Sequence, residues 1–410
     1  MKTKTLKLRQ WTENSCPKIQ ISGSKSETNR LLILQKLYPH FEIKNASDAQ
    51  DTHLLKQALE NHTPEVDIHH AGTAMRFLTA YFAIQEGKET LLTGSSRMKQ
   101  RPIAPLVEAL RMLGADITYL ENEGYPPLKI KGKTLMKSEV TISASISSQF
   151  ISALLLIGGR LPQGLRLNLQ GEITSRPYLE MTLQMLSDLG IKNEWRGQSI
   201  QVEPMPSAPK ISVEEVESDW SSASYFYSLA AIGRHSVRLG SFKAHSKQGD
   251  AVLAQLYHTY FGIKTQFEPH HQIRLEPQPD FQFPELIRLD MNDCPDIAQT
   301  LCVTAAALKI PFEITGLATL KVKETDRLVA LQNELRKIGV KTAISADAIK
   351  TLAFTTPELC PEIKTYHDHR MAMSFAPYAL VAPLKIEDPE VVEKSYPRFW
   401  QDFDAVLKEK

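Results

Sequence analysis

The segment Leu320-Lys-Val-Lys-Glu-Thr-Asp-Arg-Leu328 places two lysines, two carboxylates and an arginine directly after a strand-like run that ends at Gly316. Apolar residues at Leu328, Leu331 and Leu335 predict that a helix follows. The charged segment therefore lies at a strand-to-helix turn, where helix N–H groups without helical partners and the helix dipole attract anions. This pattern indicates a site for phosphates or carboxylates. The alternative is a solvent-exposed helix start with surface ion pairs.

The composition excludes several classes of protein. The chain has 410 residues, enough for two domains, and a net charge of only +1, so no global field would gather nucleic acid or an acidic membrane. The four cysteines form no CxxC pair, which fits a reducing compartment. We see no signal peptide and no apolar run long enough to span a bilayer. A soluble, cytoplasmic protein is expected.

One pattern recurs six times along the chain: a small or charged polar cluster opens an apolar helix. The openings are Ser24-Lys-Ser, Gly72-Thr-Ala-Met-Arg, Ser147-Ser-Gln, Asp219-Trp-Ser-Ser, Pro295-Asp and Asp368-His-Arg. Between them, amphipathic helices over 105–113, 179–189, 253–261 and 328–338 each end near a glycine, which is typical of a helix C-cap. A repeat of about 60–70 residues indicates two α/β domains of three units each.

The domain boundaries follow from this repeat. We expect one domain over residues 18–216, holding units one to three, and a second over residues 1–17 and 217–410, holding units four to six. The chain would then cross twice between the domains, and two crossing segments make a hinge.

The motifs of the best-known cofactor, metal and serine-nucleophile sites are absent from the sequence. There is no GxxxxGK[ST] loop, no GxGxxG after a strand, no HExxH and no GxSxG. The cations stand at the repeat openings, where arginines can grip phosphate or carboxylate with two hydrogen bonds. Acid–base chemistry on anionic substrates remains, with Asp296, Glu324 and Lys25 as the candidate groups and no cofactor or metal.

Several long motifs resemble the enolpyruvylshikimate-phosphate (EPSP) synthase family. They run in order over nearly the whole chain: Gly23-Ser-Lys-Ser-Glu-Thr-Asn-Arg30, Ala71-Gly-Thr-Ala-Met-Arg76, Arg97-Met-Lys-Gln-Arg-Pro102, Ser147-Ser-Gln149, Ser175-Arg-Pro-Tyr178, Asp219–Tyr225, Pro295-Asp296, Lys321–Arg327, Asp368-His-Arg-Met-Ala-Met373 and Lys394-Ser-Tyr-Pro397. The resemblance implies a two-domain inside-out α/β barrel, with three βαβαββ units in each domain, that closes over its substrates.

The resemblance also implies a reaction. The family transfers the enolpyruvyl group of phosphoenolpyruvate to the 5-hydroxyl of shikimate 3-phosphate and releases phosphate, by addition and elimination through a tetrahedral intermediate. The expected partners are these two small molecules, with no nucleic acid or membrane, and the protein is expected to be a monomer. By motif position, the base is Asp296, the acid is Glu324, and Lys25 is the third catalytic group.

The remaining site residues are carried over in the same way. The resemblance assigns shikimate 3-phosphate to Lys25, Ser26, Arg30, Ser147, Ser148, Gln149, Ser175, Tyr178, Asp296, Thr319 and Lys323. It assigns phosphoenolpyruvate to Lys25, Gly72, Arg101, Gln149, Arg327, Arg370 and Lys394. Gly72 also has a physical reason, since a backbone N–H can approach a ligand there without a Cβ in the way.

The sequence departs from the family pattern at several positions in or near these motifs. His69-His70 replaces the usual Gly-Asn, Phe77 replaces a proline, Thr319 replaces an asparagine that contacts the shikimate ligand, and His367 replaces an asparagine. Two alternatives to the shikimate reaction stay open. One is enolpyruvyl transfer to a UDP-amino sugar, and the other, motivated by these departures, is a catalytically silent homologue that binds a phosphorylated ligand. The UDP-sugar family carries a reactive cysteine where this chain has Ser95–Arg101, and none stands there.

Overall fold

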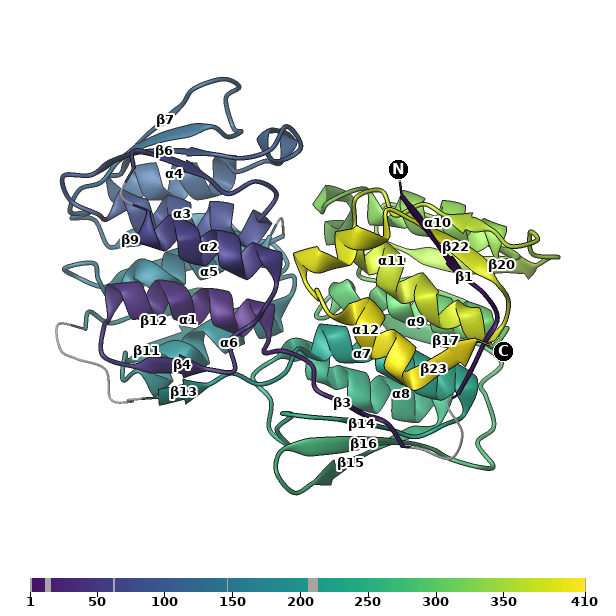
Figure 1. Ribbon diagram of the computed structural model, residues 1–410. Coiled ribbons are helices and arrows are strands. Elements are labelled where there is room, and N and C mark those ends of the chain that lie inside the picture. Colours follow the sequence, from purple (N-terminus) through teal and green to yellow (C-terminus); the bar gives the residue numbers. More distant parts are fainter. Residues whose placement is uncertain (1, 12–15, 62, 146, 206–212, 410) are drawn as a thin grey trace. The chain divides into compact units, whose positions relative to one another are not determined.

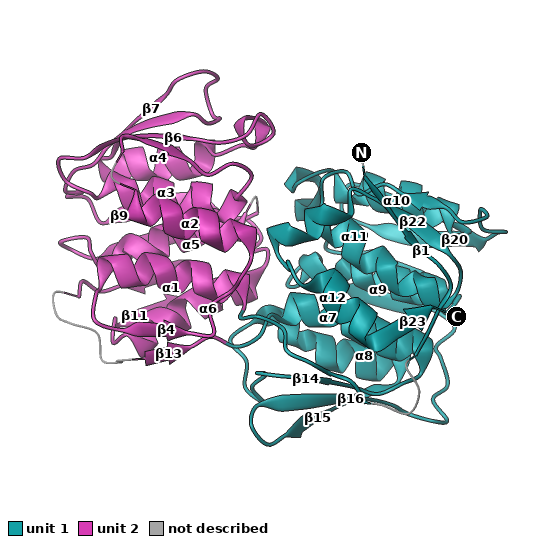
Figure 2. Ribbon diagram, viewed as in Figure 1, with its two compact units in different colours: residues 1–23, 217–410 teal, residues 24–216 magenta. Residues whose placement is uncertain are grey.

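The computed structural model describes residues 2–11, 16–61, 63–145, 147–205 and 213–409, which divide into two compact units (Figure 2). Unit 1 comprises Met1–Gly23 and Glu217–Lys410, and unit 2 comprises Ser24–Val216. The first crossing lies six residues later than the sequence suggested. Lys18 and Ile19 pair in parallel with Arg238 and Leu239, so the segment up to Gly23 belongs to unit 1.

Unit 2 has the following elements: α1 (Lys25–Leu37), β4 (Glu42–Lys44), α2 (Gln50–Glu60), β5 (Glu65–Asp67), α3 (Gly72–Ala83), β6 (Glu89–Thr93), η1 (Met98–Gln100), α4 (Ala104–Leu113), β7 (Asp116–Tyr119), β8 (Leu128–Lys131), β9 (Glu139–Ser143), α5 (Ser148–Gly158), β10 (Leu165–Gln170), α6 (Arg176–Asp188), β11 (Asn193–Arg196), β12 (Ser199–Val202) and β13 (Val213–Glu215).

Unit 1 has these: β1 (Thr3–Leu6), β2 (Arg9–Trp11), β3 (Lys18–Ile19), α7 (Trp220–Gly233), β14 (Val237–Leu239), η2 (Gly249–Val252), α8 (Leu253–Phe261), β15 (Ile263–Glu268), β16 (Gln272–Pro277), β17 (Ile287–Asp290), η3 (Pro295–Ile297), α9 (Ala298–Ala307), β18 (Phe312–Thr315), η4 (Ala318–Val322), α10 (Arg327–Lys337), β19 (Val340–Ile344), β20 (Ile349–Phe354), β21 (Glu362–Ile363), α11 (His369–Phe375), η5 (Ala376–Leu380), β22 (Leu384–Glu387), η6 (Pro389–Lys394), α12 (Phe399–Val406) and β23 (Leu407–Glu409).

Four sheets share one strand order, which is the structural form of the sequence repeat. They are β5-β6-β8-β7, β9-β10-β12-β11, β17-β18-β20-β19 and β3-β14-β16-β15. In each, the first two strands are parallel and an antiparallel hairpin completes the sheet. In the first three sheets a helical segment joins the two parallel strands. The fourth sheet takes its first strand, β3, from the N-terminal segment, while β13 pairs with β4 in unit 2.

The most apolar helices lie inside each unit, and the sheets lie outside them. Every residue of α5 from Phe150 to Gly158 is buried, and so is every residue of α9 from Ala298 to Ala306. A helix that is apolar on all sides must be surrounded by protein. The strands instead alternate between buried and exposed residues, as in β10, so one sheet face meets the helices and the other meets solvent. Figure 1 shows α1, α2 and α3 side by side within unit 2.

All six predicted helix openings begin a helix, although the fifth begins with the short helix η3. Ser24 and Ser147 cap α1 and α5, and Asp219 and Asp368 cap α7 and α11, each accepting a hydrogen bond from a first-turn N–H. The amphipathic helices are present as predicted, and Gly114 ends α4 in the left-handed region at φ 108°. Among the described residues, no helix combines the length and apolar character that crossing a membrane requires.

Candidate active site

Arg327 is the centre of a cluster of ion pairs in unit 1, at the start of α10. Its guanidinium donates from Nε to Asp368 Oδ2 (2.6 Å), from Nη1 to Asp296 Oδ1 (2.9 Å) and from Nη2 to Glu324 Oε2 (2.7 Å). The side chain is only 2% exposed. Burial lowers the pKa of Arg327, but the three carboxylates outweigh burial and raise it above its usual value. Arg327 therefore stays charged and holds the three carboxylates in place.

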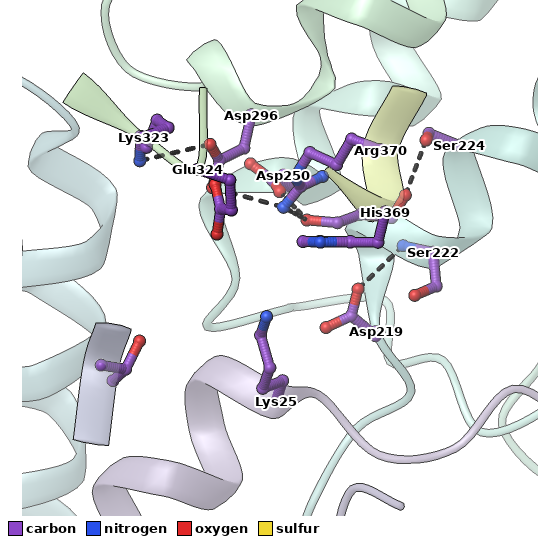
Figure 3. Close-up of polar contacts among 12 residues, drawn as sticks. Lys25, Asp219, Ser222, Ser224, Asp250, Asp296, Lys323, Glu324, His369 and Arg370 are labelled. Atoms are coloured by element: carbon purple, nitrogen blue, oxygen red, sulfur yellow. Dashed lines mark hydrogen bonds and ion pairs between the residues drawn. The ribbon is translucent and has the colours of Figure 1, made fainter. Parts of the chain in front are cut away.

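Three further cations from separate elements complete this cluster. Lys323 Nζ and Arg370 Nη2 each lie 3.3 Å from an oxygen of Asp296, and Lys394 Nζ lies 3.0 Å from Glu324 Oε1. Figure 3 shows the pair of Lys323 with Asp296. Six predicted site residues thus form one network, and the four cations each pair with one or both of the candidate catalytic carboxylates.

The charge state of Asp296 follows from these contacts. Burial raises the pKa of its carboxyl, but Lys323, Arg370 and Arg327 together outweigh burial and hold the pKa well below the usual range. Without a ligand, Asp296 is therefore an ionised carboxylate with three cationic partners. Asp296 is therefore a weak proton acceptor as long as these cations stay paired with it.

Asp250 is a buried carboxyl that the sequence interpretation missed. It lies in η2, accepts a short hydrogen bond from Ser221 Oγ, and Ser221 Oγ in turn accepts from Arg370 Nη2 at 3.4 Å. Burial, together with the nearby charge of Asp296, raises the pKa of Asp250 to about 6. No local signal marks this residue, since it stands apart from the repeat openings and reaches the cluster only through packing of η2 against α7. Figure 3 labels Asp250 together with Asp296 and Arg370.

The raised pKa of Asp250 predicts that the stability of the protein depends on pH. Its folded pKa lies above the usual value of about 3.9, so the folded state binds the proton more tightly and loses stability as pH rises from about 4 to about 6. Between pH 5 and pH 7, wild type should lose roughly 1 kcal/mol more of its unfolding free energy than Asp250→Asn does. Urea unfolding of both proteins at the two pH values checks this. Parallel pH profiles for the two proteins would contradict it.

In unit 2, the first two turns of α1 carry Lys25, Ser26 and Arg30. Lys25 Nζ lies 3.2 Å from Asp51 Oδ2. Arg30 is buried, and four of its five N–H groups donate to Thr182 Oγ1, Ser152 Oγ and the backbone carbonyls of Ser26 and Tyr178. Burial lowers the pKa of Arg30 to about 10. Arg30 thus ties Ser26 to the Tyr178 region, with most of its donors already used inside the protein.

A second group in unit 2 forms around the start of α3. A Cβ on Gly72 would overlap the guanidinium of Arg101, so the absence of a side chain lets Arg101 lie against this helix start. Arg101 is 7% exposed, and its Nε has no hydrogen-bond partner among the described residues. Gln149 Nε2 donates to Thr73 Oγ1 at 3.4 Å, which joins α5 to the same place. A buried guanidinium N–H of this kind suits an anionic ligand.

The remaining predicted residues lie at helix starts or in turns. Ser147 caps α5 and Ser148 is its first residue, while Ser175 precedes α6 in the left-handed region at φ 53°. Thr319 lies in η4, and its buried hydroxyl has no hydrogen-bond partner among the described residues. The structure therefore links the unit 1 residues Asp296, Lys323, Glu324, Arg327, Arg370 and Lys394 directly, and distributes the unit 2 residues over the starts of α1, α3, α5 and α6 and the turn after η1.

A family model described as EPSP synthase (3-phosphoshikimate 1-carboxyvinyltransferase) matches residues 55–403. The chain belongs to the EPSP synthase family. It is 46% identical over 390 residues to the 3-phosphoshikimate 1-carboxyvinyltransferase of Bacteroides fragilis, covering 94% of this chain and 93% of that one. It is 36% identical over 423 residues to the protein of the same name from Haemophilus influenzae, covering 95% of this chain and 96% of that one. The resemblance drawn from the motifs is confirmed.

Solved structures show the same fold. An EPSP synthase from Acinetobacter baumannii superposes with a TM-score of 0.72 at 21% identity and covers 98% of both chains. The predicted EPSP synthase fold is therefore confirmed. The described strands make open sheets of two to four strands around buried helices. The relatives from Bacteroides fragilis and Haemophilus influenzae are named for the shikimate acceptor, and no comparison favours the UDP-amino sugar alternative.

Proposed function

We propose that this protein transfers the enolpyruvyl group of phosphoenolpyruvate to the 5-hydroxyl of shikimate 3-phosphate and releases phosphate. The observation that carries the proposal is the network in unit 1, where four cations pair with two carboxylates, Asp296 and Glu324, in a chain of the EPSP synthase family. Each substrate has a phosphate and a carboxylate, so four anionic groups must be bound. Clustered arginines and lysines suit such ligands.

The network has a consequence for catalysis. The cations that should bind the substrates are paired with Asp296 and Glu324 when no ligand is present. We propose that the substrate anions take over these cations. Burial would then act on Asp296 without its opposing charges, so its pKa would rise and the carboxylate would become a stronger base. In this proposal, binding of the substrates itself prepares the base.

The proposed reaction then proceeds in two steps. Asp296 takes the proton of the 5-hydroxyl, the hydroxyl oxygen bonds to C2 of phosphoenolpyruvate, and Glu324 gives a proton to the methylene carbon, which yields a tetrahedral intermediate. In the second step Glu324 takes a proton back from the new methyl group, the C2–O bond to phosphate breaks and the double bond re-forms, while Asp296 passes its proton to the departing phosphate. Lys25 is proposed to neutralise charge that develops on the reacting groups.

The binding residues are proposed as the family motifs place them. Shikimate 3-phosphate is assigned to Lys25, Ser26, Arg30, Ser147, Ser148, Gln149, Ser175, Tyr178, Asp296, Thr319 and Lys323, and phosphoenolpyruvate to Lys25, Gly72, Arg101, Gln149, Arg327, Arg370 and Lys394. The buried hydroxyl of Thr319 and the Nε of Arg101 support this assignment, because a ligand could supply the partners that the described residues do not. Arg30, with most of its donors engaged, would offer a ligand one N–H at most.

The contact between Gly72 and Arg101 leads to a prediction about the binding of phosphoenolpyruvate. In Gly72→Ala the new methyl group would displace the Arg101 guanidinium. We expect KM for phosphoenolpyruvate to rise about tenfold or more, as expected when a charge-assisted hydrogen bond is lost, while KM for shikimate 3-phosphate changes less than twofold. Steady-state kinetics with each substrate varied in turn measures both constants. An unchanged KM for phosphoenolpyruvate would remove Gly72 and Arg101 from its site.

One assay tests the function. Purified protein is incubated with phosphoenolpyruvate and either shikimate 3-phosphate or UDP-N-acetylglucosamine, and phosphate release and product mass are measured. We expect release and a product only with shikimate 3-phosphate. Release with the UDP-sugar would favour the sister reaction. Failure to release phosphate with either acceptor, despite measurable binding of shikimate 3-phosphate, would favour a silent binding protein.

We further propose that the protein acts as a monomer in the cytoplasm and that its two chain crossings form a hinge. The four cysteines are free, which fits a reducing compartment, and the net charge of +1 gives no reason to expect nucleic acid or membrane partners. Sedimentation with and without both substrates tests the monomer: a mass near 46.1 kDa is expected in each case, and a dimer mass would contradict it.

A further inference from the structure

A histidine approaches the second oxygen of the carboxylate that pairs with Lys25. Asp51, in the first turn of α2, is buried, with its side chain 4% exposed. Its Oδ2 lies 3.2 Å from Lys25 Nζ, and its Oδ1 lies 3.6 Å from His70 Nε2. His70 belongs to the turn between β5 and α3, two residues before Gly72. Three elements of unit 2 therefore meet at one carboxylate.

The two oxygens of Asp51 face different groups: Oδ2 accepts a hydrogen bond from Lys25, and Oδ1 lies in longer polar contact with His70. A lysine side chain is long and flexible, and an ordering partner is needed to hold its ammonium at one place. Asp51 supplies that partner for Lys25. His70 Nε2 approaches the other oxygen at 3.6 Å, a close polar contact that is longer than a hydrogen bond.

We propose that His70 is a positioning residue for enolpyruvyl transfer, acting through Asp51 on Lys25. The inference rests on the proposed function, because it assumes that Lys25 serves the reaction described above. His70 need not touch either substrate. Its contribution is to keep one Asp51 oxygen directed at Lys25 while the turn that carries Gly72 is held beside α2.

The first test compares three single variants. In His70→Ala, kcat/KM for phosphoenolpyruvate should fall about tenfold, a typical coupling energy for contacting residues. His70→Gln keeps a polar nitrogen near the position of Nε2 and should recover most of the loss. His69→Asn is the matched control, since His69 is exposed and has φ 50°, a left-handed conformation that asparagine tolerates. It should stay within twofold of wild type. An unchanged His70→Ala overturns the inference.

The second test is a double-mutant cycle with Asp51→Asn. If His70 acts through the Asp51 carboxylate, His70→Ala should cause less than a twofold further loss in the Asp51→Asn background. The same tenfold loss in both backgrounds would mean that His70 acts independently, and the inference would be wrong. Thermal unfolding midpoints identify any variant that has lost its fold.

A wild-type control separates this inference from the proposed function. Lack of turnover by wild type would count against the proposed function, and the cycle would then be read from the dissociation constant for phosphoenolpyruvate measured by calorimetry. Non-additive increases in that constant would uphold the coupling of His70 to Asp51, and additive increases would overturn it. A wild type that binds no phosphoenolpyruvate would overturn both.

Discussion

Replacing Asp296 with asparagine is expected to lower kcat by about 10²–10⁴-fold, the range for loss of a general base. The amide keeps the size of the side chain and can still accept a hydrogen bond from Arg327, but it cannot take the proton of the 5-hydroxyl. Steady-state phosphate release at saturating substrates measures the effect. The reason lies in the proposed exchange, in which Lys323, Arg327 and Arg370 leave Asp296 for the substrates.

Asp293→Asn is the matched control for this prediction. Asp293 lies three residues earlier, is exposed and has no part in the ion-pair network described above. Its kcat should remain within twofold of wild type. If Asp296→Asn kept a kcat close to that of Asp293→Asn, Asp296 would not be the base, and the assignment of roles in the cluster would have to change.

Replacing Arg327 with alanine is expected both to abolish turnover and to cost about 3–5 kcal/mol of stability. The sequence places Arg327 in the phosphoenolpyruvate site and so predicts only the loss of activity. The structure adds the second effect, because the guanidinium is nearly inaccessible and bonds three carboxylates at 2.6–2.9 Å. Without it, Asp368, which is fully buried, would lose its closest cation.

Chemical unfolding of Arg327→Ala and wild type measures the stability difference. Lys321→Ala serves as the control, since Lys321 is exposed in the same segment and should change the unfolding free energy by less than about 0.5 kcal/mol. A fully stable Arg327→Ala would show that the three carboxylates do not depend on Arg327. Wild-type turnover in that variant would remove Arg327 from the site.

The fold could be predicted from the sequence where the signals are local. Helix caps such as Ser24 and Asp368, and C-cap glycines such as Gly114, act on their immediate neighbours, so a single segment reveals them. The sequence suggests a first domain crossing that is too early, because the pairing of β3 with β14 joins segments about 220 residues apart. No pattern within residues 18–23 could show that partner.

The same distinction holds for the site. The cations stand at helix starts and can be recognised there, as Arg370 and Lys323 were. Their pairing with Asp296, the burial of Asp250 and the approach of His70 to Asp51 depend on the packing of elements far apart in the chain. The sequence could therefore name most participants, but it could not show that the anion-binding cations are engaged by the catalytic carboxylates.

The affinity of Asp296→Asn for phosphoenolpyruvate tests the proposed exchange most directly. If cations leave Asp296 to bind the ligand, removing its charge should make binding easier although catalysis is lost. Calorimetric titration of phosphoenolpyruvate alone should show about tenfold tighter binding by Asp296→Asn than by wild type, in line with one released charge-assisted hydrogen bond. Unchanged or weaker binding in this variant would contradict the account.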